Sequence, residues 1–265
     1  MIPEISDHLC SFEPNPTIFE MDANKSLRER LLSGPLIDVY VGESKRHWAL
    51  HRNLLSYHSA AFQSDFEDNF PDNTPTKSKQ RSETPSENGR LKLPDVDPLG
   101  FELFVKYMYQ GKLEDVSSIS DSQDKYTYAV SCYHLHRLCD KLDMPKLKNI
   151  AMDQYRKGLA EAELVPDAEE INEIYSKSPE GSAFRSLVTK IAARQIMDPD
   201  SERDAESYRI CFDNNPDFAI DLVNAIKAGI GGLLLDDPTD GDDCEYHDHS
   251  DGPNCHNKGK TKLGK

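Results

Sequence analysis

The stretch from residue 38 to residue 66 constrains the fold most strongly, because it specifies two strands and a helical pair with almost no connecting residues. Apolar and polar residues alternate over Asp38–Gly42 and Arg46–Leu50, which predicts a hairpin. From His51 the apolar spacing becomes helical. A unit this compact, with no obvious reaction centre, is typical of a surface that binds other proteins. The residues expected to hold the unit together are Asp38, His51, Leu54, Leu55, Ser59 and Phe62.

A short helix is expected before the hairpin. Ser26 and Glu29 form a capping box that starts it, and Gly34-Pro35 ends it. The helix carries Leu27, Leu31 and Leu32. With the first strand, we expect these leucines to form a dimer interface, because a two-fold contact can use one self-complementary patch.

Polar segments and helical patterns alternate beyond the hairpin. Residues 71–90 hold no large apolar side chain, which predicts a flexible insertion. A short strand is expected at Leu91–Leu93, and another from Leu113. The expected helices run from Pro98 to Gly111, over 126–142, from Pro145 to Gly158, after an Asp167–Glu170 capping box, around Phe184–Ala192, and after Pro216 with Phe218, Leu222, Val223 and Ile226 buried.

Charge and composition narrow the possible partners. The formal net charge of −16 repels phosphate backbones, so direct nucleic-acid binding is not expected. The first residues lack a basic region and the longest apolar run is far too short to cross a membrane. Buried cysteines at helical spacing, Cys132 and Cys139, favour reduced thiols. We therefore expect an intracellular protein, cytoplasmic or nuclear, with no membrane partner.

The order of these elements and the residues within them resemble those of the BTB/POZ domain. The segments that carry the resemblance are Gly34–Gly42, His51–Ser56, Ser59–Phe62, Leu91–Pro98 and Phe101–Leu113. The continuation is similar to the short BTB proteins of filamentous fungi. The resemblance implies self-association and recruitment of partners, although a fold alone does not select among these uses.

These observations predict an α+β protein built on a BTB/POZ fold, a small mixed sheet packed with a helical cluster. The expected divisions are a flexible arm at 1–25, the BTB/POZ domain at 26–160 with its insertion at 71–90, a helical extension at 161–235 and a disordered acidic tail at 236–265.

No catalytic constellation is evident. Asp38 and His51 have no nucleophile near them in the pattern, so structural roles are expected, with Asp38 bonding backbone and His51 anchoring the start of a helix. A metal at His134, His136 and Cys139 is not expected, because residues two apart on a helix point to different faces. We therefore predict that the protein is not an enzyme and needs no cofactor in its core.

The tail offers one possible exception. Cys244, His247, Cys255 and His256 provide four soft ligands at a spacing that could close a small tetrahedral zinc site. The surrounding run from Asp236 to Asp251 holds eight acidic residues and is also typical of a solvated, disordered segment. Both interpretations stay open.

Three functions follow from the sequence. The first is an interaction module that forms homodimers and recruits partners that the sequence does not identify. The second is a substrate adaptor that binds a cullin ubiquitin-ligase scaffold, although the insertion at 71–90 falls where such adaptors engage the cullin and no Kelch repeat or MATH domain is recognisable. The third is a transcriptional or chromatin co-regulator recruited by a separate DNA-binding protein.

Overall fold

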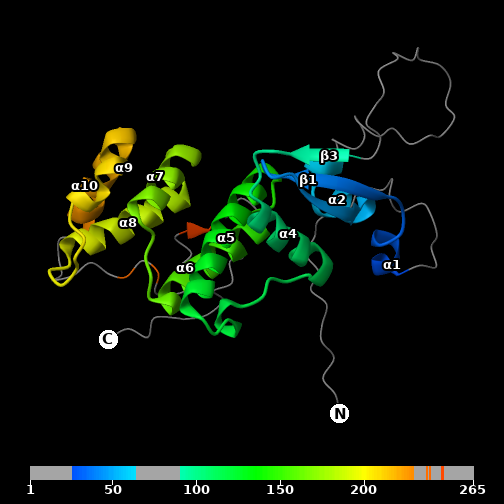
Figure 1. The fold of residues 1–265 in the computed structure, drawn as a ribbon, viewed down its shortest axis with the longest axis horizontal. Helices are drawn as coiled ribbons and strands as arrows, with labels where there is room; N and C mark the ends of the chain where they lie inside the picture. The colour runs from blue at the N-terminus through cyan, green and yellow to red at the C-terminus, as the bar shows by residue number, and fades with distance from the viewer. Residues whose placement is uncertain (1–25, 64–89, 230–236, 238, 240–245, 248–265) are drawn as a thin grey trace, which may run out of the picture. The chain divides into compact units, whose positions relative to one another are not determined.

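The computed structural model describes residues 26–63, 90–229, 237, 239, 246 and 247, which fall into two compact units. The secondary structure of the first unit comprises α1 (Leu27–Leu31), β1 (Leu36–Val41), β2 (Arg46–His51), α2 (Arg52–His58) and β3 (Arg90–Leu93) (Figure 1). The second comprises α4 (Pro98–Gln110), α5 (Ser122–Lys141), α6 (Pro145–Ala162), α7 (Ala168–Lys177), α8 (Ala183–Met197), α9 (Arg209–Asn214) and α10 (Pro216–Gly229).

The three strands form a small mixed sheet in the order β2-β1-β3, so the α+β prediction is confirmed. In the central strand Ile37, Val39 and Val41 are buried and the residues between them are not, which is the alternation expected of a strand with one covered face. The predicted hairpin is confirmed as β1 and β2. Strand β3 begins at Arg90, one residue before the expected strand, so Arg90 does not belong to the insertion; residues 71–89 lie outside the described residues.

Helix α2 contacts both α1 and β2 within the first unit (Figure 1). Its inner face carries Leu54 and Leu55, which are 3% and 0% exposed. Ser59, the C-cap of α2, and Phe62, in the helical residues 60–63, are buried as well. Four of the six residues expected to hold this unit together therefore lie in its core.

Helices α4, α5 and α6 form the centre of the second unit. The Asp97 carboxylate accepts hydrogen bonds from the backbone N–H groups of Leu99 and Gly100 and so starts α4, while Gly111 ends it with a φ of +74°. Helices α5 and α6 pack along their lengths. The expectation that a helix ends at Gly158 is wrong: α6 continues to Ala162, and Gly158 lies inside it against Ala129 of α5.

The strand expected from Leu113 is also absent from the structure, where Leu113 is irregular and Val116–Ser118 forms a 3-10 helix. The Asp115 carboxylate accepts from the Ser117 N–H, and the Val116 N–H donates to the Gln154 side chain at 2.9 Å. These bonds give the backbone a local alternative to sheet pairing.

The helical extension packs as a group, with α10 on α8 and α9 on α7 (Figure 1). The capping box at Asp167 and Glu170 is confirmed. Phe184 of α8 contacts the rings of Tyr133, His136 and Tyr155, so the extension buries its apolar residues against α5 and α6. Phe218 and Leu222 of α10 are buried as expected, whereas Val223 is 63% exposed because it lies on the outer face of that helix. The predicted limits of the domains stay predictions.

Candidate interaction surface

The leading-helix face consists of Leu27, Leu31, Leu32 and Leu36, three residues of or next to α1 and the first residue of β1. Helix α1 has no buried residue, and Leu27, Leu32 and Leu36 are 36%, 37% and 57% exposed. Isolated exposed leucines are ordinary, but three along one short segment, together with the partly buried Leu31, concentrate apolar area that the described residues do not bury. The sequence predicted this face at Leu27, Leu31 and Leu32. Its role as a dimer interface stays a prediction.

The position of α1 is fixed by α2. The Asn53 amide donates to the backbone carbonyl oxygens of Arg30 at 3.1 Å and Ser33 at 2.6 Å. The Arg52 N–H donates to the Pro35 carbonyl at 3.1 Å. The two bonds from Asn53 tie carbonyl groups at and just after the end of α1 to α2. The leading-helix face is therefore presented on a fixed support, although a five-residue helix is too short to be stable alone.

Asp38 lies in β1 and His51 is the last residue of β2. The Asp38 carboxylate lies 2.7 Å from Nε2 of His47, so its partner in the structure is a side chain and not the backbone group that was expected. His51 occupies the N-cap of α2 with extended backbone but makes no side-chain capping bond, so it starts the helix by position only. The Asp38–His47 pair is about half exposed at the surface.

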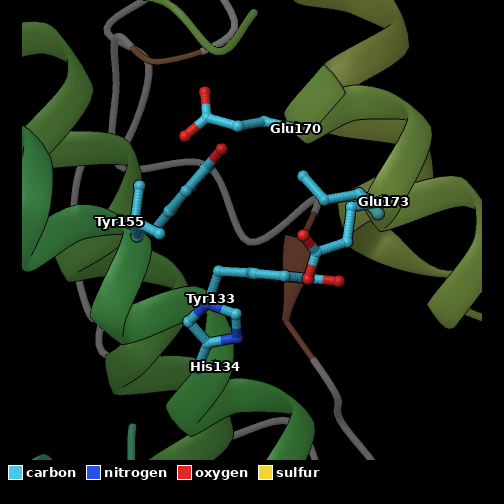
Figure 2. A pocket seen from close by; sticks show the side chains of 7 residues that line it. Tyr133, His134, Tyr155, Glu170 and Glu173 are labelled. Carbon is cyan, nitrogen blue, oxygen red and sulfur yellow. The ribbon is translucent and has the colours of Figure 1, made fainter. Parts of the chain in front are cut away.

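A polar cavity of about 30 Å³ lies between α5, α6 and α7, and sequence reasoning did not identify it. Figure 2 draws the side chains that line it and labels five of them, with Tyr155 pointing toward Glu170 and Tyr133 toward Glu173. That volume accommodates one or two water molecules. It is far below the several hundred Å³ of a typical small-molecule site, so we assign it to packing of the helices.

Hydrogen bonding explains why these polar groups are tolerated in a buried place. The Tyr126 hydroxyl donates to Glu170, the same carboxylate that caps α7 through the Asp167 N–H. Burial is the main reason that the pKa of Tyr126 lies far above its ordinary value, and the hydrogen bond to Glu170 raises this pKa further. Burial lowers the pKa of His134, and Asp97, 4.0 Å from its ring, only partly opposes that shift. Both side chains are therefore neutral near pH 7.

His134, His136 and Cys139 do not converge. His134 lines the polar cavity, whereas the His136 ring lies 4.7 Å from the Phe184 ring and Cys139 is fully buried. The residues that the structure describes contain no group of three or more side chains able to hold a metal ion. Cys132, Cys139 and Cys211 are free thiols, and burial raises the pKa of Cys211 to about 11 and those of the other two further.

The predicted zinc ligands of the tail fall mostly outside the described residues, since only His247 is described. Its Nε2 lies 2.7 Å from Oδ1 of Asp153 on α6, and its side chain is 3% exposed. Tyr246 beside it is also buried. Sequence reasoning missed this contact, because an acidic run next to a polar end normally indicates a solvated segment.

The fold and the site together define a class: a small mixed sheet with a helical cluster that carries an exposed apolar segment. In the described part of the chain, no helix has the length and apolarity to cross a membrane. Residues 27–149 match the model of the BTB/POZ domain, so the chain contains a BTB/POZ domain, a module that generally mediates protein–protein interaction. The search of curated proteins found no match for this chain.

Proposed function

We propose that this protein is a non-enzymatic interaction protein that forms a homodimer through the leading-helix face and recruits further proteins. The observation that carries the proposal is the exposure of Leu27, Leu32 and Leu36 within the residues that match the BTB/POZ domain. The family's general role in protein association supports it. The free, buried thiols favour a reducing, intracellular setting.

The physical basis is burial of apolar area. A fully buried leucine contributes roughly 1.5–3 kcal/mol relative to an exposed one. In a two-fold contact each leucine is used twice, so even partial burial of this face on two subunits yields a substantial gain to set against the entropy of association. The support by Asn53 lowers that entropy, because α1 needs no further ordering.

The test is the mass of the purified chain by light scattering at micromolar concentration. We expect twice the chain mass for the wild type and a single chain mass for Leu32→Asp or Leu31→Asp. The reason is that a carboxylate in an apolar contact loses its hydration without gaining a partner.

Leu164 provides a matched control. It is 37% exposed, as Leu32 is, but lies just after α6 in the second unit. The Leu164→Asp variant is expected to keep the dimer mass. A wild-type mass of one chain, or equal dissociation of the Leu32 and Leu164 variants, would contradict the proposal.

A cullin adaptor remains the second candidate, because α7 to α10 follow the matched domain and pack with α5 and α6 in one unit. Such an arrangement could brace a scaffold contact made by the BTB/POZ domain. Pull-down of a cullin by the full chain tests this function, and failure to capture the cullin while the dimer forms would leave the first proposal alone.

A further inference from the structure

The tail-docking face is formed by Asp153 and Arg156 of α6 and by Lys190 and Arg194 of α8, all of which lie outside residues 27–149. Tyr246 from the tail lies on this face. Its ring centroid is 4.8 Å from the Arg156 guanidinium carbon and 5.3 Å from the Lys190 ammonium nitrogen. Tyr246 is 3% exposed and Arg156 4% exposed, so this cation–π contact is shielded from water.

A histidine–carboxylate hydrogen bond and an ion pair also attach the tail to this face. Nε2 of His247 lies 2.7 Å from the Asp153 carboxylate, and the Asp237 carboxylate lies 2.5 Å from the Arg194 guanidinium. Asp237 also accepts hydrogen bonds from the Thr239 N–H and hydroxyl. Each contact uses a different helix residue, so the face recognises several groups of one segment.

The charges of the segment and the face are complementary. The chain as a whole has a formal net charge of −16, yet this face contains the basic residues Arg156, Lys190 and Arg194. The tail sequence from Asp236 to Asp251 holds eight acidic residues. Asp153, the acidic member of the face, meets the histidine of the tail. Asp237, Tyr246 and His247 therefore each have a matching partner on the face.

Space remains beside the docked residues. A hollow of about 530 Å³ is bounded on one side by Tyr246 and His247 and on the others by α5, α6 and the turn between α7 and α8. The charged side chains that line it are Arg137, Lys141, Lys148, Lys177, Asp140 and Glu180. The excess of basic groups favours an acidic segment that continues past the tyrosine.

We propose that the tail-docking face is a binding site for a partner's acidic segment that contains a tyrosine followed by a histidine. The chain's own Asp237, Tyr246 and His247 occupy the site in cis, and the partner's segment displaces them. A tethered segment is present at high effective concentration, so the site opens to a partner only when the tail is released or outcompeted. The inference goes beyond the proposed function, since it concerns a surface outside the matched domain.

The experiment uses a fluorescein-labelled peptide of residues 237–247, with Cys244→Ser to prevent disulfide exchange, and fluorescence anisotropy with the full chain. Tyr246→Ala in the chain removes the cis anchor and is expected to tighten peptide binding on the order of tenfold or more. Tyr246→Phe keeps the ring over Arg156 and Lys190 and is expected to bind the peptide as weakly as the wild type does.

Two controls locate the site. The Tyr109→Ala variant removes a tyrosine that is 38% exposed at the end of α4 and is expected to leave peptide binding at the wild-type level. Adding Lys190→Glu to the Tyr246→Ala chain is expected to abolish the gain. Binding that Tyr246→Ala does not tighten, or that persists with Lys190→Glu, would overturn the proposal, and neither outcome depends on whether the chain is a dimer.

Discussion

The close approach of α5 and α6 at Gly158 leads to the most specific stability prediction. A Cβ atom at Gly158 would lie 2.8 Å from the Cβ of Ala129 and 3.3 Å from the backbone carbonyl oxygen of Lys125. Carbon atoms in contact are normally about 3.5–4.0 Å apart, so Gly158→Ala forces the two helices to separate or tilt. Because the nearest atoms belong to the backbone or to a methyl group, no flexible side chain can move aside.

Two opposing effects set the magnitude. Replacing glycine by alanine inside a helix stabilises it by about 1 kcal/mol. Overpacking a well-packed core costs about 1–3 kcal/mol, and the rigid neighbours at Gly158 favour the upper part of that range. We therefore expect Gly158→Ala to lower the free energy of unfolding by about 1–2 kcal/mol, the opposite of the effect at an exposed helix position.

The reciprocal variant separates the clash from general damage to the helix. Ala129→Gly alone should cost about 2 kcal/mol, from lower helix propensity and a lost buried methyl group. In the double variant Ala129→Gly/Gly158→Ala the methyl group moves from one helix to the other and the 2.8 Å contact between the two Cβ positions is removed. The double variant should therefore be more stable than the sum of the single effects predicts, by roughly 1–3 kcal/mol.

Urea unfolding followed by far-UV circular dichroism measures all four free energies, provided that the slopes with urea agree among the variants. A Gly158→Ala protein more stable than the wild type would refute the reasoning. So would single effects that add to within about 0.5 kcal/mol, since residues in contact are expected to couple by more than that.

Two further predictions concern titration and metal. Burial lowers the pKa of His134, so the unfolded chain binds a proton at this histidine more readily than the folded chain does, and the free energy of unfolding should fall as the pH drops through about 6.5. The His134→Gln variant should lose less stability over the same pH range, as measured by urea unfolding. For the tail, we propose zinc binding by Cys244, His247, Cys255 and His256, with Asp153 orienting His247 through Nε2 and leaving Nδ1 for the metal; elemental analysis of the purified chain should find zinc that the Cys244→Ser/Cys255→Ser variant lacks.

Elements with local chemical determinants could be predicted from the sequence. The two capping boxes, at Ser26 and at Asp167, depend on side chains three residues apart, and both are present in the structure. The β1–β2 hairpin likewise depends on alternation within a few residues. Elements decided by tertiary contacts were missed or misjudged. Gly158 resembles a helix end in sequence, but the proximity of Ala129 explains its presence inside α6.

The candidate surfaces divide in the same way. Leu27, Leu31 and Leu32 are visible in the sequence as the apolar residues of a short capped helix, whereas their exposure is known only from the structure. The tail-docking face is not visible, since Asp153, Arg156, Lys190 and Arg194 are ordinary polar residues of two helices until the fold brings them together. Tyr246 was the available clue: an aromatic residue in an acidic run favours burial more than its neighbours do.

The two surfaces differ in their chemistry, and this difference bears on how they could act in one protein. The leading-helix face offers apolar area, so association there depends on the removal of leucines from water and is not specific for charge. The tail-docking face offers guanidinium and ammonium groups that are shielded by the tail, so binding there requires an anionic segment with an aromatic ring. A second copy of the chain suits the first surface, because a two-fold contact needs only self-complementarity. A different protein is the expected partner of the tail-docking face, because the tail of each copy already binds this face in cis. Only a segment that competes with the tail can then form a new contact there.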